Sequence, residues 1–443
     1  MKEIKIGMVS LGCSKNRVDS ELMLGALKKK NYVFTADPAQ ADAIIINTCG
    51  FIQSAKQESI DTILEMAEFK KTGNLKALIV CGCLSGRYQK ELSRQLPEVD
   101  AFLGVTAYDK IAQAVEQALQ GLHFESYDAP KIEGDYKSRV LTTPSHYAYL
   151  KIAEGCNNRC AYCAIPYIRG GLKSRPIEEI LQEAEVLLQK GVRELILVAQ
   201  DTSKYGVDLA GKSMLCQLID ALAPLPGLKW LRLLYCYPDG ITDELLDTMS
   251  KYGNIARYLD IPIQHLADPV LRRMNRKNTH RSTYEAVERI RKRYPDFILR
   301  TTLIAGFPGE TQEDFEILKR GVEELQFDRL GVFAYSREDG TPAARLPGQI
   351  PEQVKQARAR ELMLLQQGIS LRANKKRIGQ RLEVLVEEYL PEEKVYLARS
   401  YGEAPEIDGG IILRSEQPLE CGSFYTAAIE DANEYELIGG IAK

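Results

Sequence analysis

Long hydrophobic runs and an excess of either charge are both missing from this sequence. No stretch approaches the roughly 18 consecutive apolar residues of a membrane-spanning helix, so we expect no membrane association. The 58 basic and 61 acidic residues give a net charge of −3, which excludes a uniformly basic nucleic-acid binder but allows a local basic patch. The chain starts with charged residues and leads directly into a predicted strand, without the apolar segment of a signal peptide. We therefore expect a cytoplasmic protein.

Cysteines are too sparse for a disulfide scaffold. The chain has ten of them in 443 residues, whereas small secreted domains that depend on disulfides carry them at much higher density. In a reducing compartment, clustered cysteines more often bind metal or take part in chemistry. Six of the ten are placed in a way that indicates such a role.

Residues 1–120 alternate between short apolar strands and amphipathic helices. Strands are predicted at 5–11, 43–47, 77–81 and 101–105, and helices at 20–30, 54–70, 87–95 and 109–119. Strands separated by helices form parallel sheets, so the chain is predicted to be an α/β protein that begins with a doubly wound parallel sheet. The alternation fails at 121–145, where proline, glycine and mixed charges predict a linker.

A second alternating series occupies residues 146–350. Its strands are predicted at 148–153, 194–199, 230–234, 258–263, 298–305 and 329–334. Six such units favour an open, partial (β/α)6 barrel over a closed eightfold one. A long, charged connecting helix is predicted at 351–376. Residues 377–443 contain β-like runs at 382–386, 395–398, 411–413 and 425–429, with glycine and proline between them, and these predict a small β-barrel.

The strongest chemical signal is the spacing CxxxCxxC formed by Cys156, Cys160 and Cys163, directly after the first barrel strand. Zinc sites favour paired CxxC units and four ligands, whereas these three thiols have no fourth Cys or His beside them. Three thiolates on a four-iron cluster leave one iron open for catalysis. The alternatives are an incidental loop and a zinc site whose fourth ligand comes from elsewhere in the chain.

This spacing, in this position, resembles the radical S-adenosyl-L-methionine (AdoMet) superfamily. The resemblance implies a [4Fe–4S] cluster on the three cysteines, whose open iron binds the amino and carboxylate groups of AdoMet. It also implies reductive cleavage of AdoMet to methionine and a 5′-deoxyadenosyl radical. It identifies no catalytic residue beyond the cluster ligands.

A second group of cysteines is spread over the N-terminal domain. Cys13, Cys49 and Cys83 each follow one of the first three predicted strands. Because the carboxyl ends of parallel strands share one edge of a sheet, where ligands bind, we expect the three to meet there and hold a second cluster. Cys81 competes with Cys83 for the third position. We prefer Cys83, because it lies beyond the strand end. Cysteine is also a common core residue, so a purely structural role is the alternative.

The two cysteine groups together resemble the methylthiotransferase family over nearly the whole chain. The matching segments are Leu-Gly-Cys-Ser-Lys-Asn at 11–16, Asn-Thr-Cys at 47–49, Gly-Cys-Leu at 82–84, Arg-Pro at 175–176 and Gly-Phe-Pro-Gly-Glu at 306–310. The terminal β-domain resembles the TRAM domain of that family. The family implies two [4Fe–4S] clusters, with sulfur supplied or carried by the N-terminal one, and two uses of AdoMet, as radical source and as methyl donor. A reductant and a sulfur donor are implied partners.

Several residues at the ends of barrel strands are candidates to bind AdoMet, because polar residues at this face of a barrel are typical of active sites. By resemblance, Gln200-Asp201 binds the amino group, and a helix cap is the alternative for Asp201. The adenosine is expected against the fifth strand and an aromatic residue of the cysteine loop. Arginines that can meet an anionic substrate or the AdoMet carboxylate complete the set. The candidates are Tyr162, Gln200, Asp201, Arg300, Thr302, Ile304 and Phe307, with Gly306 allowing close backbone approach and Arg169 and Arg175 as further cations.

The family divides by substrate, into enzymes that modify a tRNA adenosine beside the anticodon and enzymes that modify an aspartate of the twelfth small-subunit ribosomal protein. From residue 378 onward the chain has five basic and fourteen acidic residues, a net charge of −9. RNA binding needs cations that displace phosphate counterions, so this charge favours a basic protein partner and makes tRNA an unlikely one.

Segments 335–341 and 399–409 also resemble the ribosomal-protein branch. That resemblance implies hydrogen abstraction from the β-carbon of the aspartate, followed by addition of a methylthio group. Glu403, Glu406 and Asp408 occupy a loop-like stretch, and we expect them to lie free on the surface and attract the substrate. The tRNA-modifying activity is the alternative, and a protein whose metal only supports a binding surface is a more distant one.

Overall fold

A six-stranded parallel sheet forms the N-terminal part of the protein in the computed structural model, which describes residues 3–442. The strand order is β2-β1-β3-β4-β5-β6. The strands are β1 (Lys5–Ser10), β2 (Val33–Phe34), β3 (Ala43–Thr48), β4 (Ala77–Gly82), β5 (Ala101–Leu103) and β6 (Phe124–Ser126). The helices are α1 (Ser14–Lys28), α2 (Gln53–Ala67), α3 (Phe69–Thr72), α4 (Cys83–Tyr88), α5 (Lys90–Gln95) and α6 (Ile111–Leu119).

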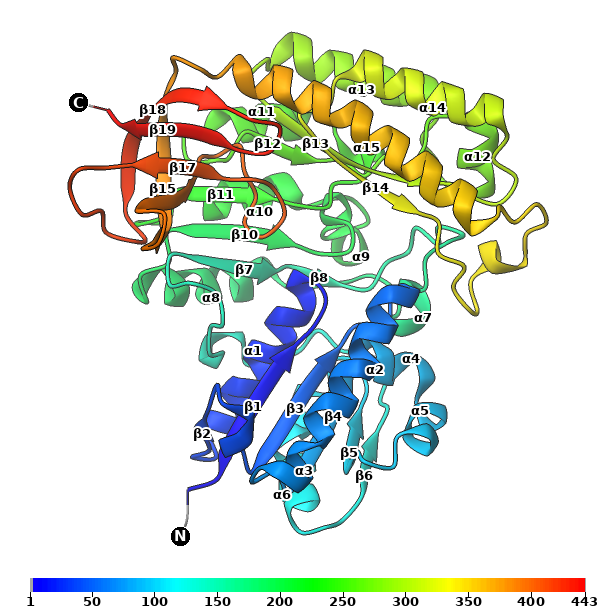
Figure 1. Ribbon diagram of the computed structural model, residues 1–443, viewed down its shortest axis with the longest axis vertical. Coiled ribbons are helices and arrows are strands. Elements are labelled where there is room, and N and C mark those ends of the chain that lie inside the picture. The colour runs from blue at the N-terminus through cyan, green and yellow to red at the C-terminus, as the bar shows by residue number, and fades with distance from the viewer. Residues whose placement is uncertain (1–2, 443) are drawn as a thin grey trace.

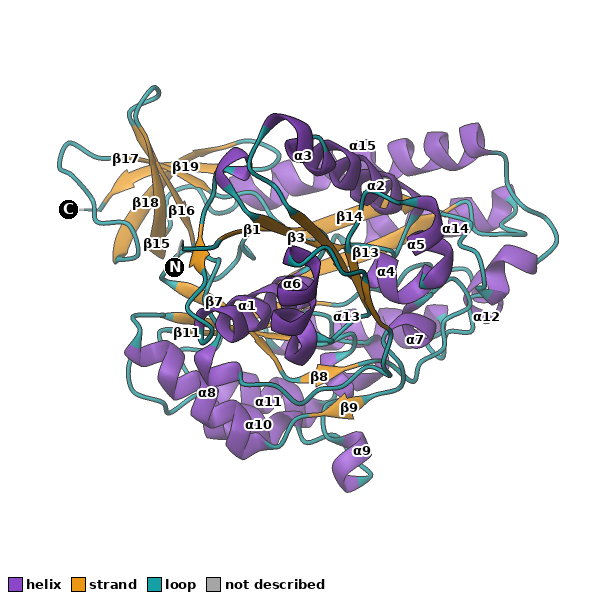
Figure 2. Ribbon diagram, turned by 90° about the horizontal axis from the view of Figure 1, so that it is seen from below, coloured by secondary structure: helices purple, strands orange, loops and turns teal. Residues whose placement is uncertain are grey.

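Helices cover both faces of this sheet, as Figure 2 shows. Alternate side chains of each strand point to opposite faces, so Ile45 joins the core under α1 and α6, whereas Ile44 and Ile46 join the core under α2 and α5. The doubly wound arrangement predicted from the sequence is therefore confirmed. The carboxyl ends of β1, β3 and β4 lie side by side at the edge that faces the rest of the molecule.

Two features of this part differ from the sequence-based expectation. Strand β6 pairs with β5 inside the segment predicted to be a linker, and its short Phe-Glu-Ser sequence carries no clear strand signal. Helix α1 begins at Ser14, six residues before the predicted start. Its first two turns are polar, and they read as a loop because hydrophobic periodicity cannot identify a helix that buries polar side chains.

Six parallel strands form an open barrel in the middle of the chain, each followed by a helix. They form two three-stranded sheets, β11-β10-β7 and β12-β13-β14, linked by a bridge between Leu231 and Ile255. The strands are β7 (Tyr147–Lys151), β10 (Glu194–Val198), β11 (Trp230–Leu233), β12 (Tyr258–Asp260), β13 (Ile298–Ala305) and β14 (Arg329–Ala334). Within residues 3–442, β7 and β14 do not pair with each other, so the barrel is partial, as predicted.

The six covering helices are α8 (Ile177–Gln189), α10 (Leu215–Leu222), α11 (Asp243–Lys251), α13 (His280–Arg293), α14 (Gln312–Leu325) and α15 (Glu352–Lys375). Short helices α7 (Ile165–Ile168), α9 (Val207–Ala210) and α12 (Asp268–Arg273) lie in the loops at the carboxyl ends of the strands. Helix α15, predicted to be a connector, packs along β14 and α14 and contributes Leu362 and Ile369 to the barrel core. No helix formed by residues 3–442 combines the length and apolar composition of a membrane span.

The C-terminal part is a closed five-stranded barrel with the order β15-β16-β17-β19-β18. Its strands are β15 (Arg381–Leu390), β16 (Val395–Arg399), β17 (Ile411–Arg414), β18 (Phe424–Ala432) and β19 (Leu437–Ile441). Four of the five were predicted. The fifth, β19, contains two consecutive glycines, which weaken a strand signal, and it closes the barrel by pairing with β17 and β18.

The terminal barrel lies beside the central one (Figure 1), and buried ion pairs join the two. Arg399 and Arg232 both donate to Glu194, each at 2.7 Å. Glu403 is fully buried and accepts from Arg377 at 2.6 Å and Arg329 at 3.1 Å. Burial would raise the pKa of Glu403, but the two guanidinium groups outweigh it and lower that pKa to about 2.

The expectation that Glu403, Glu406 and Asp408 lie free on the surface is wrong. Asp408 accepts a hydrogen bond from the Tyr258 hydroxyl at 2.7 Å and its side chain is nearly buried. Glu406 is partly exposed, but it pairs with Arg17 of the N-terminal part at 2.7 Å. These carboxylates hold the three parts of the chain together, and they were misread because a loop-like sequence does not show what packs against it.

Replacing Glu403 with Gln is expected to destabilise the protein by about 3–5 kcal/mol, because it leaves two buried guanidinium groups without their anion. Stability should be measured by urea denaturation at neutral pH, where the wild-type contribution is fully present. In the wild type this contribution is retained above the usual pKa of about 4.5 and lost as the pH falls toward about 2. Glu406→Gln, which breaks an exposed pair, is the control and should cost at most about 1 kcal/mol. Equal effects of the two changes would contradict the role given to Glu403.

Candidate functional site

The loop that carries Cys156, Cys160 and Cys163 is held between two short antiparallel strands. These are β8 (Ala153–Glu154) and β9 (Lys173–Ser174). Gly155 opens the loop with φ +72°, and a Cβ there would lie 2.1 Å from the carbonyl oxygen of Gly171, so only glycine fits. The loop is also fixed by the amide of Ala161, which donates to the carbonyl of Met274 at 2.9 Å. The three thiols are therefore held by a rigid frame at the carboxyl end of the barrel, where barrel enzymes bind their ligands.

Burial favours the protonated form of two of these three thiols. It raises the pKa of Cys156 to about 11 and that of Cys163 to about 12. A thiolate is the form that binds metal, so a cation at this site would be needed to keep the sulfurs ionised at neutral pH. None of the ten cysteines takes part in a disulfide.

The second group of cysteines gathers where β1, β3 and β4 end. Cys13 caps α1, Cys49 follows β3, and Cys83 is the first residue of α4. The side chain of Asn16 clamps the first two loops, because its amide donates to the carbonyls of Leu11 at 2.8 Å and Thr48 at 3.0 Å. The closeness of the loops is evident at Gly12, where a Cβ would lie 3.2 Å from the sulfur of Cys49.

The electrostatic surroundings of these three thiols differ. Burial raises the pKa of Cys83 to about 11, although Arg169 donates to its sulfur at 3.4 Å. Burial also raises the pKa of Cys49. At Cys13 the effect of burial is outweighed by the positive charges of Lys15 and Arg169, which lower its pKa. One edge of the N-terminal sheet thus combines three thiols with two cations.

Cys81, the competing candidate, points into the core beneath α1. Its sulfur lies 3.7 Å from that of Met23 and 3.6 Å from the carbonyl oxygen of Ile46, and 2% of the residue is exposed. Cys83 lies beyond the strand end, beside Arg169 and Asn16. This placement supports Cys83 as the third member of the N-terminal group.

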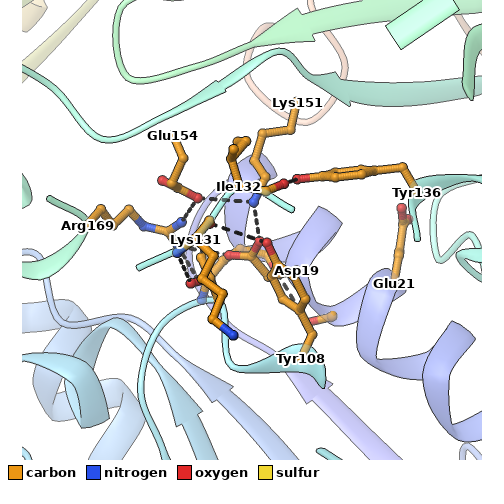
Figure 3. A network of polar contacts seen from close by, with 12 residues as sticks. Asp19, Glu21, Tyr108, Lys131, Ile132, Tyr136, Lys151, Glu154 and Arg169 are labelled. Carbon is orange, nitrogen blue, oxygen red and sulfur yellow. Dashed lines mark hydrogen bonds and ion pairs between the residues drawn. The ribbon is translucent and has the colours of Figure 1, made fainter. Parts of the chain in front are cut away.

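A buried network of charges joins α1 of the N-terminal part to β7, β8 and Arg169 of the barrel (Figure 3). Arg169, six residues after Cys163 and directly after α7, donates to Asp19 of α1 at 3.1 Å and to Glu154 of β8 at 2.8 Å. Lys151 at the end of β7 pairs with the same two carboxylates. Burial would raise the pKa of Glu154, but Arg169 and Lys151 lower it to about 2. The elements that carry the two cysteine groups are therefore joined by a buried network of two cations and two anions.

Sequence reasoning missed Asp19, Lys151 and Glu154, and it assigned Arg169 to an anionic ligand. Arg169 is fully engaged by protein groups, so it has no free edge for a carboxylate. Arg175 pairs with Glu183 at 2.5 Å and donates to the carbonyl of Lys151 at 2.9 Å, while its Nε is buried without a hydrogen-bond partner among the described residues. The available signal was the presence of charged residues at core positions of a predicted strand, which requires a buried partner.

Gln200 and Asp201 lie next to the cysteine loop. The Gln200 amide donates to Glu154 at 2.7 Å, while its carbonyl oxygen is buried without a hydrogen-bond partner among the described residues. A buried acceptor without a donor is costly, and the amino group expected from the family would satisfy it. Asp201 accepts from Asn158 of the cysteine loop at 2.7 Å and also caps the turn that follows, through the amide of Ser203 at 3.1 Å. Asp201 thus acts as a helix cap through one carboxylate oxygen, which was the alternative considered from the sequence. Its other oxygen binds Asn158 of the cysteine loop.

The fifth strand presents Arg300, Thr302 and Ile304 along the open interior of the barrel, since alternate residues of β13 are partly exposed. Arg300 pairs with Asp260 at 2.9 Å and lies 3.5 Å from Asp408, so most of its charge is already matched. Tyr162 packs edge-to-face against Phe307, with 6.5 Å between the ring centroids.

Phe307 itself is fully buried, which leaves only its backbone available to a ligand. At the preceding residue, Gly306, a Cβ would collide with Lys355 of α15 at 2.2 Å. The packing of α15 therefore requires glycine there, which is a reason that the sequence did not show; close approach of a ligand at Gly306 stays a prediction.

A cavity of about 560 Å³ opens beside the cysteine loop, within the range typical of small-ligand sites. Its wall includes Cys156, Asn158, Asp201, Lys204, Asp239 and Lys277. It therefore adjoins two of the predicted site residues and lies at the carboxyl ends of β7, β10 and β11.

The donor sets fit iron–sulfur clusters better than single metal ions. Within residues 3–442, no three Cys, His, Asp or Glu side chains converge on one point as ligands of a mononuclear site do. Cysteine ligands of a four-iron cluster bind different irons, so they need not converge in this way. Each group supplies three free thiols on rigid loops.

The partial barrel, the CxxxCxxC loop and the terminal barrel define a radical SAM enzyme with a TRAM domain. Three family models agree with this. They are described as the radical SAM superfamily, which matches residues 150–320, the TRAM domain, which matches residues 378–441, and the uncharacterized protein family UPF0004, which matches residues 5–104. These domains imply that the protein uses AdoMet and iron–sulfur chemistry.

Full-length relatives give the particular family. The chain is 51% identical to the ribosomal protein uS12 methylthiotransferase RimO of Desulforamulus reducens and 50% identical to that of Clostridioides difficile, over 99% of both chains in each case. It is 49% identical to the RimO of Geobacter sulfurreducens, over 99% of this chain and 98% of the relative. The chain belongs to the RimO family of ribosomal protein uS12 methylthiotransferases, and the resemblance inferred from its motifs is confirmed.

Solved structures share the fold. The radical S-adenosylmethionine methyltransferase TsrM of Kitasatospora setae, determined with tryptophan and a SAM analogue, superposes with a TM-score of 0.57 at 12% identity, over 95% of this chain and 82% of that one. Its structure with cobalamin and a [4Fe–4S] cluster gives a TM-score of 0.54, also at 12% identity, over 95% and 84% of the two chains.

Proposed function

We propose that this chain adds a methylthio group to the β-carbon of an aspartate in ribosomal protein uS12, with two [4Fe–4S] clusters and AdoMet as cofactors. Cys156, Cys160 and Cys163 would hold the radical cluster, and Cys13, Cys49 and Cys83 the second one. The observation that carries the proposal is the buried network of Arg169, Asp19, Lys151 and Glu154, which joins the elements that carry the two thiol groups. The same substrate carbon must lie within reach of both cofactors, and this network fixes the positions of the two thiol groups relative to each other.

When bound, the cofactors supply a deoxyadenosyl radical at one site and sulfur at the other, while the protein supplies position and exclusion of water. Glu154 orients Gln200, whose unpaired carbonyl oxygen would accept from the AdoMet amino group. Thr302 and Ile304 would line the adenosine side, together with Tyr162. Arg169, which donates to the sulfur of Cys83, is a positioning residue for the N-terminal cluster.

The surface of the terminal barrel supports a basic protein substrate, although less strongly than the sequence count suggests. Its exposed acidic residues are Glu383, Glu388, Glu392, Glu393, Glu406, Glu416, Glu420, Glu430 and Asp431, of which Glu406 pairs with Arg17. The exposed basic residues among those described are Arg381, Lys394 and Arg414. Such a surface repels phosphate and favours encounter with a basic partner, and ribosomal proteins are typically basic.

A substrate choice assay tests this proposal. The anaerobically reconstituted enzyme is given AdoMet and a reductant, with uS12 and unmodified tRNA offered together, and both are analysed by mass spectrometry. We expect a methylthio group on one aspartate of uS12 and none on tRNA. Modification of tRNA without modification of uS12 would overturn the substrate assignment in favour of the tRNA branch. Raising the salt concentration should weaken uS12 binding, since screening shortens the range of surface charges from roughly 10 Å at 0.1 M to roughly 3 Å at 1 M.

A further inference from the structure

The side chain of Lys15 is a buried cation that forms no hydrogen bond or ion pair with an anion among the residues that the structure describes. Lys15 is the second residue of α1, two residues after Cys13, and 8% of it is exposed. Its ammonium group lies 3.5 Å from the centroid of the Tyr235 ring. Within residues 3–442 no carboxylate or carbonyl oxygen accepts a hydrogen bond from this ammonium group, and it forms no ion pair. An ammonium group has three donor hydrogens, and all three remain available.

The neighbouring charges do not compensate Lys15. Asp19 and Glu154 are engaged by Lys151 and Arg169. Two cations and two anions cancel within that network, so Lys15 adds a further positive charge between the thiol groups. Cys13 and Glu154 attract this charge, but neither forms a hydrogen bond or an ion pair with it. Burying an unpaired charge is costly, and natural proteins accept this cost mainly where a ligand supplies the partner.

Tyr235, which lies against Lys15, is itself held in an unusual conformation. Its φ is +62°, in the left-handed region that bulky side chains rarely adopt. The conformation is fixed by its amide, which donates to Asp260 at 3.1 Å, and by its carbonyl, which accepts from the amide of Thr202 at 3.0 Å. Backbone strain of this kind concentrates at functional sites. Tyr235 also follows the end of β11, on the face of the barrel where ligands bind.

Lys15 lies in the region where the proposed reaction must place the substrate carbon. Lys15 belongs to the N-terminal part, next to Cys13, while Tyr235 belongs to the barrel, so the pair lies where the two parts meet. The carbon that loses hydrogen at one site and receives sulfur at the other must lie in the same region. The β-carbon of aspartate carries a carboxylate one bond away.

We propose that Lys15 binds the side-chain carboxylate of the substrate aspartate and thereby selects an acidic residue, an inference that rests on the function proposed above. Tyr235 holds the lysine in place, and the carboxylate completes the ion pair. A neutral amide or an adenine ring gives no such compensation, so the same lysine discriminates against both. The rival role is to offset the charge of the N-terminal cluster. Geometry favours substrate binding, because it is Arg169 that donates to a cysteine sulfur.

A cycle of two substitutions tests this inference by equilibrium binding. Reconstituted wild-type enzyme, Lys15→Met, Lys15→Arg and the control Arg17→Gln are titrated anaerobically, with AdoMet but without reductant, with uS12 and with uS12 whose target aspartate is replaced by asparagine. Arg17 lies on the same helix, and its partner is the partly exposed Glu406, so the control removes one positive charge outside the proposed site. Iron content and the EPR spectra of the reduced clusters are recorded for every variant.

Wild-type enzyme, Lys15→Arg and Arg17→Gln should prefer the aspartate form. Lys15→Met should bind it about a hundredfold more weakly, as expected when one partner of a buried ion pair is removed, and bind the asparagine form as the wild type does. An unchanged preference in Lys15→Met overturns the inference, and an unchanged preference with loss of iron from the N-terminal site assigns Lys15 to the cluster. If the wild type fails to modify uS12 in the substrate choice assay, both the proposed function and the inference are wrong. If the wild type is active and Lys15→Met still prefers the aspartate form, only the inference is wrong.

Discussion

Cys160→Ala is expected to reduce AdoMet cleavage to background while the N-terminal cluster remains. The substitution removes one of three thiol ligands from a loop that has no other cysteine or histidine, so the radical cluster should not assemble. Iron should fall from about eight to about four per chain, as one four-iron cluster is lost. The measurements are iron analysis after anaerobic reconstitution and quantification of 5′-deoxyadenosine by chromatography. Cys156→Ala and Cys163→Ala should behave in the same way.

Cys421→Ala is the matched control for this prediction. Cys421 is a free, exposed cysteine of the terminal barrel, distant in sequence from both thiol groups, and its replacement should leave iron content and AdoMet cleavage unchanged. Normal production of deoxyadenosine by Cys160→Ala would contradict the assignment of the radical site. Stoichiometric zinc without iron in the wild-type protein would favour a structural metal site.

Cys83→Ala is expected to abolish transfer of the methylthio group while reductive cleavage of AdoMet survives. Cys83 is the thiol beside Arg169 at the end of β4, and its loss should remove the second cluster and with it the source of sulfur. Cys13→Ala and Cys49→Ala should have the same phenotype. The readouts are iron content, the EPR spectrum of the remaining cluster, deoxyadenosine yield and mass spectrometry of uS12.

Cys81→Ala is an internal control two residues away. Its sulfur packs against Met23 in the core, so its replacement should cost about 1 kcal/mol of stability, in the usual range for a small core change, and leave both clusters in place. If Cys81→Ala removed the second cluster and Cys83→Ala did not, the third ligand would be misassigned by two residues.

Much of the fold was predictable because its signals are local. The alternation of apolar strands with helices predicts parallel sheets without any knowledge of contacts, and strands such as β3, β4 and β13 lie within one residue of their predicted bounds. The elements that were missed have weak local signals. Strand β6 is three residues long, β19 contains two glycines, and the first turns of α1 are polar.

The sequence by itself determined the two thiol groups and the family. A CxxxCxxC spacing places three sulfurs in one loop in any fold that allows the loop to form, and cysteines that follow adjacent parallel strands must share an edge of the sheet. Only the tertiary structure decided which charged residues are free. Arg169 is paired with carboxylates, and Glu403 with guanidinium groups, from distant parts of the chain. Lys15 instead lies against an aromatic ring and forms no ion pair among the described residues. Burial and pairing of a charge depend on residues up to hundreds of positions away, so a sequence pattern cannot distinguish a solvated charge from a buried ion pair or from a buried cation that lies against an aromatic ring.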